Sequence, residues 1–333
     1  MTTPFRARAP RHLAVTAIRL LAVTAAYLAA GRLGLLRQVV IAGAKVTPLW
    51  PPTGIALTCL LLLGLGIWPA VALGAYLVVI TTGPAHWSSL GIVAGNTLAP
   101  VAAYLMLRRV GFRIELDRLR DGVALVFLGA FAGMLVSSTV GATVLLLNGS
   151  LPADGFWSTW SAWWTGDAMG VLVITPLLLA LRTARPPADP GPLDWVEPVL
   201  LLAGTAAVTL IATSTTVNLL FLVFPFLIWA ALRFRLIGAA PCVLLISVIA
   251  IIAATDRSGP FARHGLVADM VVLQALNGCA ALTGLLLSAI IAEQRNTYRR
   301  IEQACVELAE VVNRLAPGKA DTSQWLPPED GSR

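Results

Sequence analysis

Ten apolar segments follow one another along this chain, and they restrict its fold more than any other feature of the sequence. A helix needs about 20 apolar residues to cross a bilayer, where the backbone has to satisfy its own hydrogen bonds. Only 12% of the residues are charged, whereas soluble domains carry about 25%. The sequence therefore predicts an all-α, polytopic transmembrane helix bundle, with segments near 12–31, 50–65, 67–82, 88–108, 121–147, 160–182, 195–213, 217–235, 237–254 and 267–292.

The number of spans has two interpretations. The segments 50–65 and 67–82 are short for bilayer spans. They are either two separate spans, which makes about ten in all, or the two halves of a re-entrant hairpin, which leaves eight. Both numbers are even, so both termini are expected on the same side of the membrane.

Arginine and lysine indicate which side this is, because cytosolic loops of membrane proteins are enriched in them. With a cytosolic amino terminus, only five of the 24 arginines and lysines fall in outer segments, namely Arg32, Arg37, Lys45, Arg257 and Arg263. We therefore expect both termini in the cytosol. The same distribution explains the net charge of +7 as membrane topology, so the lipid bilayer is an expected partner and nucleic acid is not.

The chain changes character after the last apolar segment. Apolar residues there recur at alternating spacings of three and four, as in the a and d positions of a heptad. We expect a short cytosolic helix over 295–316, either a dimeric coiled coil or a single amphipathic helix, with a seam of Tyr298, Ile301, Cys305, Leu308, Val312 and Leu315. A coiled coil makes the protein a homodimer. The other expected parts are a cytosolic tail at 1–11, the membrane domain at 12–294 and a disordered tail at 317–333.

The stretch Trp157–Pro176 carries the strongest candidate for a functional site. Asp167 is its only charged residue, and no other charge follows until Arg182. The spacing i, i+3, i+4, i+7 predicts one shared helical face for Trp160, Trp163, Trp164 and Asp167. A carboxylate inside a membrane costs about 2.5–3.5 kcal/mol on insertion scales, so it requires a partner, a water-filled cavity or a proton.

Polar residues of other segments are expected at the depth of Asp167, in the outer half of the bundle. We predict a ligand-binding cavity open to the outer face, with the tryptophans as stacking or cation–π walls. Its further lining residues are Asn96, Trp50, Pro51, Pro52, Thr53, Gly54, Gln274 and Asn277. Two alternatives remain open: a structural tie from Asp167 to Asn96 or Gln274, and an ordinary interfacial helix start at Trp50–Gly54. No metal motif occurs, and no cofactor is expected.

Several motifs stand in a defined order along the chain. They are Leu49-Trp50-Pro51-Pro52-Thr53-Gly54, Trp68-Pro69, Gly95-Asn96, Trp163-Trp164 with Gly166-Asp167, Phe224-Pro225 with Trp229-Ala230, and Arg233-Phe234. Together, over roughly residues 15–295, these motifs resemble the membrane-associated sensor family of the MASE type, first class.

The resemblance implies an integral membrane sensory domain of the bacterial cytoplasmic membrane. Members of that family usually precede an output such as a histidine kinase, a diguanylate cyclase or a phosphodiesterase, and their ligands are mostly unknown. This sequence contains no kinase phosphoacceptor box, no GGDEF-like run and no nucleotide-binding glycine motif. We therefore expect a stand-alone, non-enzymatic sensor that detects a small molecule or a membrane state and acts on a separate histidine kinase or diguanylate cyclase.

A small-molecule or ion transporter is the alternative function. Asp167 would then be a proton or ion site within the membrane. The other acids of the apolar segments, Asp121, Glu197 and Asp269, lie within three residues of a segment end, and Glu293 lies at the predicted interface, so no second acid lies in the middle of a segment to form a relay with Asp167. The sequence therefore favours the sensor over the transporter.

Overall fold

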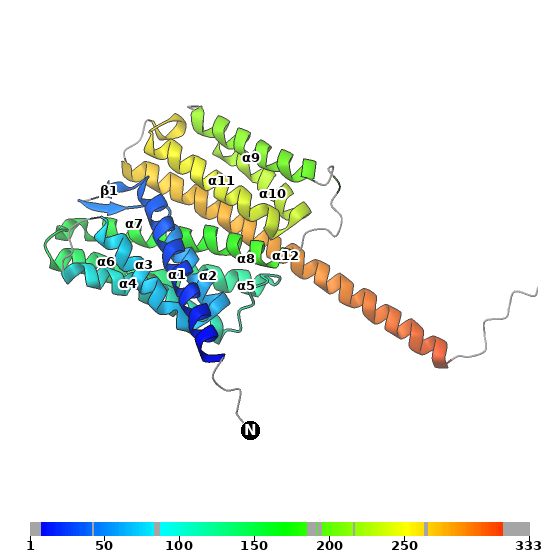
Figure 1. Cartoon of the computed structure of the whole chain (residues 1–333). Coiled ribbons are helices and arrows are strands. Elements are labelled where there is room, and N and C mark those ends of the chain that lie inside the picture. The colour runs from blue at the N-terminus through cyan, green and yellow to red at the C-terminus, as the bar shows by residue number, and fades with distance from the viewer. Residues whose placement is uncertain are drawn as a thin grey trace, which may run out of the picture.

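Helices make up almost all of the chain that the structure describes (Figure 1). A computed structural model describes residues 8–41, 43–82, 87–184, 191, 195–215, 217–262 and 266–315. Residues 1–7 of the tail predicted at 1–11 and the whole tail predicted at 317–333 lie outside the described residues, while residues 8–11 belong to the first helix. An all-α bundle is confirmed.

Each of the ten apolar segments contains a helix, but the helices differ in length. Seven helical stretches of the described chain are long and apolar enough to cross a membrane: Ala14–Leu35, Trp87–Arg109, Leu119–Leu147, Ala153–Thr183, Val196–Ser214, Leu236–Phe261 and Ala268–Val312. Three are shorter: Pro51–Leu63, Leu65–Ile80 and Leu220–Phe234. The first two were expected to be short. The third was expected to be a full span. The structure thus confirms a polytopic membrane protein, while the number of crossings and the side of the termini stay predictions.

The helices form two groups that pack side by side (Figure 1). The first group contains α1 (Arg8–Leu35), α2 (Pro51–Leu63), α3 (Trp68–Ile80), α4 (Trp87–Arg109), α5 (Leu119–Ala124), α6 (Gly133–Leu147), α7 (Phe156–Met169) and α8 (Thr175–Thr183). The second contains α9 (Val196–Ser214), α10 (Val223–Phe234), α11 (Leu236–Thr255) and α12 (Leu266–Leu315). Helices α8 and α11, and helices α7 and α12, join the two groups.

Two π-helical segments interrupt the long helices of the first group. One, Leu125–Ala132, connects α5 to α6, and the other, Gly170–Ile174, connects α7 to α8. Such segments often mark functional regions, because the widened turn shifts the side chains that follow. Here the second one begins three residues after Asp167.

A small β-hairpin follows α1, and the sequence pattern did not predict it. Strands β1 (Val39–Ile41) and β2 (Ala44–Val46) pair antiparallel, with Val40 opposite Lys45. Gly43 lies in the turn with a φ of 86°, a left-handed conformation that favours glycine. The hairpin lies at one end of the bundle, and the free end of α12 projects from the opposite end (Figure 1).

Helix α12 is continuous over 50 residues, and its last part leaves the bundle (Figure 1). The seam residues Tyr298, Ile301, Leu308 and Val312 are 54–72% exposed, and Cys305 is exposed as well. The side chain of Leu315 lies outside the described residues. Residues 295–315 are therefore helical, but they continue the last membrane helix and do not form a separate short helix, and this part of α12 does not lie against the bundle (Figure 1).

Three hydrogen bonds hold α12 where it leaves the bundle. The Leu119 backbone N–H donates to Glu293 Oε2 at 2.9 Å, and Asn296 Nδ2 donates to Asp117 Oδ2 at 3.2 Å. On the other side, Arg295 donates to the Leu232 carbonyl at 3.1 Å. The loop before α5 and the end of α10 therefore both form hydrogen bonds with the same turn of α12.

Candidate functional site

The segment before α2 docks onto α7 through backbone hydrogen bonds. The Trp50 N–H donates to the Gly166 carbonyl at 3.0 Å. The Thr53 hydroxyl lies within hydrogen-bonding distance of two carbonyls, Trp50 O at 2.8 Å and Asp167 O at 3.1 Å. Buried backbone groups have to be paired in this way, because water is absent there. The two most specific sequence motifs are thus two halves of one contact.

Glycines make this contact possible. A Cβ at Gly170 would meet the Trp50 carbonyl and the Thr53 hydroxyl, and one at Gly166 would meet the Thr47 carbonyl. A Cβ at Gly54 would meet the Gly170 carbonyl. Side chains would therefore separate α2 from α7. The motif glycines therefore allow α2 and α7 to pack closely, as small residues commonly do between membrane helices.

Pro51 and Pro52 occupy the first turn of α2, where the missing N–H groups have no intrahelical partner to lose. They and Gly54 shape the helix start and do not line the cavity described below. Both sequence interpretations of this motif are therefore compatible: it begins a helix, and its first residue, Trp50, also reaches the site.

Asp167 is 1% exposed and is held from α6. The Ser137 hydroxyl forms a hydrogen bond with Asp167 Oδ2. The Trp163 side chain also lies within hydrogen-bonding reach of this carboxyl group. The other oxygen, Oδ1, is buried and has no hydrogen-bond partner among the described residues. The predicted tie from Asp167 to Asn96 or Gln274 is absent from these contacts, and Ser137, which has no spacing signal in the sequence, takes that place.

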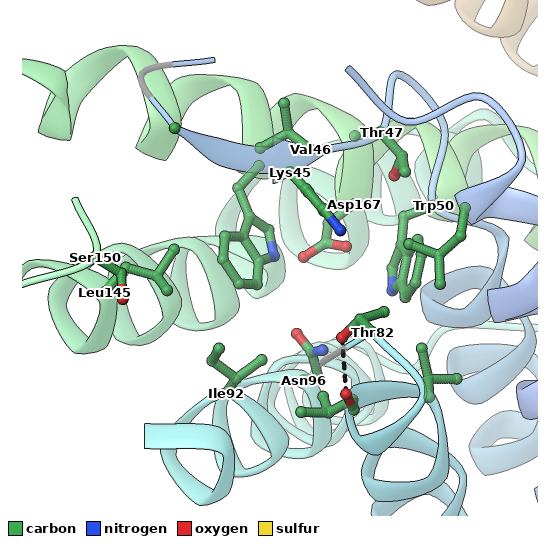
Figure 2. A pocket seen from close by; sticks show the side chains of 16 residues that line it. Lys45, Val46, Thr47, Trp50, Thr82, Ile92, Asn96, Leu145, Ser150 and Asp167 are labelled. Carbon is green, nitrogen blue, oxygen red and sulfur yellow. Dashed lines mark hydrogen bonds between the residues drawn. The ribbon is translucent and has the colours of Figure 1, made fainter. Parts of the chain in front are cut away.

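A cavity of about 300 Å³ opens beside Asp167, beneath the β-hairpin (Figure 2). Asp167 from α7 and Asn96 from α4 point into it from opposite sides, and Trp50 forms one wall (Figure 2). Asn96 is 5% exposed, and its Oδ1 also has no partner. The remaining lining residues are Leu35, Gly43, Lys45, Val46, Thr47, Val78, Val79, Thr82, Ile92, Leu145, Ser150, Trp163 and Gly166.

Lys45 is a second residue of this site, after Ser137, that the sequence pattern missed. It extends from β2 toward the Asp167 carboxylate (Figure 2). Its position in the sequence suggested only a positive charge in an outer loop. The usable signal was Gly43 between two short stretches of strand-forming residues, which is typical of a hairpin.

Trp160 and Trp164 lie away from the cavity. Their rings stack on each other with centroids 6.0 Å apart. The Trp160 indole donates to Thr139 Oγ1 at 3.0 Å, and the Trp164 indole donates to the Phe131 carbonyl at 2.8 Å. Of the three predicted tryptophan walls, the structure therefore brings only Trp163 to the site. The other two are occupied by contacts with α6, through Thr139, and with the π-helical segment Leu125–Ala132, through Phe131.

Gln274 and Asn277 are also not brought to this cavity. Gln274 donates to the Pro48 carbonyl at 2.8 Å and lines a second hollow of about 250 Å³, shared with Thr165 and Met270. Asn277 is fully buried, and neither amide atom has a partner among the described residues. Helix α12 meets α7 on another side, so equal depth did not bring these residues together.

The match to known families agrees with this arrangement. The model of the MASE1 family matches residues 19–295, a range that contains the hairpin, both motif contacts and every residue of the cavity. No curated protein and no solved structure matches the chain. Because the family match covers most of the sequence, this chain belongs to the MASE1 family of membrane-associated sensory domains.

Proposed function

We propose that this chain is a sensory module of bacterial signal transduction. It binds a small molecule in the cavity at Asp167 and reports its presence through α12 to a separate signalling protein, such as a histidine kinase or a diguanylate cyclase. The observation that carries the proposal is that one helix, α12, both contacts the surroundings of the cavity and projects beyond the bundle.

The contact at the cavity end is specific. Gln274 of α12 binds the Pro48 carbonyl, and Pro48 lies between Thr47 and Trp50, which both line the cavity. Gly278 lies one turn further along α12 and faces Met169 of α7. A ligand that shifts the segment Val46–Trp50 therefore shifts a hydrogen-bond partner of α12. Helix α12 is thus a continuous element through which a change at the cavity can be coupled to the exposed end of the helix.

The output end has the pattern of a dimer interface. Apolar side chains exposed along one seam of a helix lower their free energy when a second helix covers them. Two copies inserted in one membrane share the same orientation, so their α12 helices would lie parallel. A parallel pair places Cys305 of each chain opposite its counterpart. We therefore propose a homodimer whose paired helices pass the signal to the partner protein.

Disulfide crosslinking in membrane vesicles tests this proposal. A chain in which Cys305 is the only cysteine, with Cys59, Cys242 and Cys279 changed to alanine, should form a covalent dimer under mild oxidant. The matched control is Cys305→Ser with Val306→Cys, because Val306 is 64% exposed but lies outside the seam. The control should crosslink at least tenfold more slowly. Equal rates, or no dimer from a Cys305 that still reacts with maleimide, contradict the paired helix.

The same chain tests the link to the cavity. Asp167→Asn removes a charge at the far end of the bundle and should change the crosslinking rate of Cys305. Asp256→Asn is the control, since Asp256 pairs with Arg37 on the surface, and both side chains are substantially exposed. An unchanged crosslinking rate in Asp167→Asn would show that the cavity is not coupled to α12, and it would refute the sensor mechanism.

A further inference from the structure

Two buried oxygens with no partner point into the cavity from different helices. Asp167 Oδ1 and Asn96 Oδ1 have no hydrogen-bond partner among the described residues, although both side chains are at least 95% buried. Figure 2 shows the two groups facing each other across the cavity. Buried acceptors are normally paired, so this pair of oxygens indicates a missing donor.

The best donor for this place is an ammonium group. It offers three hydrogens, enough for both oxygens, and it compensates a carboxylate. The indole rings of Trp50 and Trp163 line the same cavity, and aromatic rings attract cations. One end of the ligand is therefore expected to be a primary amine in its charged form.

Lys45 favours a negative charge on the other end of the ligand. It is the only basic residue among those that line the cavity, and it extends over it from the hairpin (Figure 2). A ligand with an ammonium group alone would bring a second cation close to Lys45. A ligand with a carboxylate alone would bring a second anion close to Asp167. Asp167 is buried in surroundings of low dielectric, where a second anion is strongly unfavourable, whereas the exposed Lys45 repels a second cation more weakly because water screens it.

We propose that the ligand is a small zwitterion, an apolar α-amino acid. Its ammonium group binds Asp167 and Asn96, and its carboxylate binds Lys45. Its side chain lies among apolar residues of the wall, which include Leu35, Ile92 and Leu145. A volume of about 300 Å³ is at the lower end of the range for small-molecule sites, which fits a ligand of this size. This inference rests on the proposed function, because it specifies the ligand of that same cavity.

Matched ligands test the two charges one at a time. The purified protein in detergent is titrated with L-leucine, and then with 3-methylbutylamine and 4-methylpentanoate. These two analogues keep the carbon skeleton of leucine and lack the carboxylate or the amine, respectively. L-phenylalanine, 2-phenylethylamine and 3-phenylpropanoate form a second set. Tryptophan fluorescence and the melting temperature report binding, because Trp50 and Trp163 line the cavity.

At least one of the two amino acids should bind, and each of its analogues should bind at least tenfold more weakly. In Lys45→Met, the amino acid should no longer bind more tightly than its amine analogue, because the partner of the carboxylate is gone. In Asp167→Asn, the amino acid should no longer bind more tightly than its carboxylate analogue, because the partner of the ammonium group is gone. Lys45 is exposed on the hairpin, so Lys45→Met should fold normally even if Asp167→Asn does not. Arg37→Met serves as the control, because Arg37 is not among the lining residues.

Three results would overturn the zwitterion: no binding by either amino acid, equal binding of an analogue, or unchanged preference in Lys45→Met. Such a failure is distinct from failure of the sensor itself. If no amino acid binds but Asp167→Asn still alters crosslinking at Cys305, the ligand class is wrong and the sensor mechanism stands. If amino acids bind and crosslinking never responds, the site is right and the reporting helix is wrong.

Discussion

The Trp50 backbone N–H donates to the Gly166 carbonyl at 3.0 Å, and this bond joins two segments more than a hundred residues apart. It places the start of α2 against the turn of α7 that carries Asp167. The cavity wall and its acid are thus fixed relative to each other by backbone atoms. Such bonds restrict the geometry more tightly than flexible side chains do.

Gly170→Ala should strongly destabilise the protein. The new Cβ would collide with the Trp50 carbonyl and the Thr53 hydroxyl, and overpacking of this kind typically costs about 1–3 kcal/mol. Gly66→Ala is the matched control, since nothing lies within 4 Å of the position of its Cβ. Thermal unfolding in detergent measures both variants. A melting temperature for Gly170→Ala as high as that of the control would show that α2 and α7 do not meet in this way.

Ser137→Ala should lower stability by about 1–3 kcal/mol, because it leaves Asp167 Oδ2 without its donor. The neighbouring Ser138→Ala should have a much smaller effect. Ser138 is equally buried, but it bonds only to the carbonyls of Met134 and Leu135 in its own helix. Chemical denaturation in detergent compares the two variants directly. Equal losses would mean that Ser137 does not support the acid.

The topology prediction is tested with alkaline phosphatase fusions. Arg113 follows α4 at the end of the bundle where α12 leaves, whereas Pro152 lies between α6 and α7 at the hairpin end. The arginine and lysine distribution predicts an inactive fusion at Arg113 and an active one at Pro152. An active enzyme at Arg113 would reverse the predicted orientation and place the cavity on the cytosolic side.

Glu293→Ala should loosen the exit of α12. It removes the acceptor for the Leu119 N–H at the first turn of α5, and a hydrogen bond of this kind contributes about 0.5–1.5 kcal/mol. Amide hydrogen exchange in residues 119–124 should therefore accelerate severalfold. Glu302→Ala, a change on the exposed part of α12, should leave that exchange unchanged. Equally slow exchange in both variants would show that the hydrogen bond between Leu119 and Glu293 does not stabilise α5.

Local sequence patterns predicted the helices and some of the site. Apolar runs of about 20 residues specify helices in a membrane, because a helix is the arrangement in which a single segment pairs all its own backbone polar groups. The cost of a charge in such a run was sufficient to single out Asp167. Asn96 and Trp50 were predicted on the same grounds of depth and polarity, and the structure brings all three to one cavity.

Only the tertiary structure decided which side chains share that cavity. Helical periodicity places Trp160, Trp163, Trp164 and Asp167 on one face, but it does not say which neighbour covers each part of the face. Here α6 contacts Trp160, the π-helical segment Leu125–Ala132 contacts Trp164, and α12 carries Gln274 to a different hollow. Ser137 of α6 bonds to the acid, and Lys45 of β2 lines the same cavity. The physical reason is that a sequence pattern records the spacing along one helix, whereas a site is made by contacts between helices whose packing no local spacing specifies.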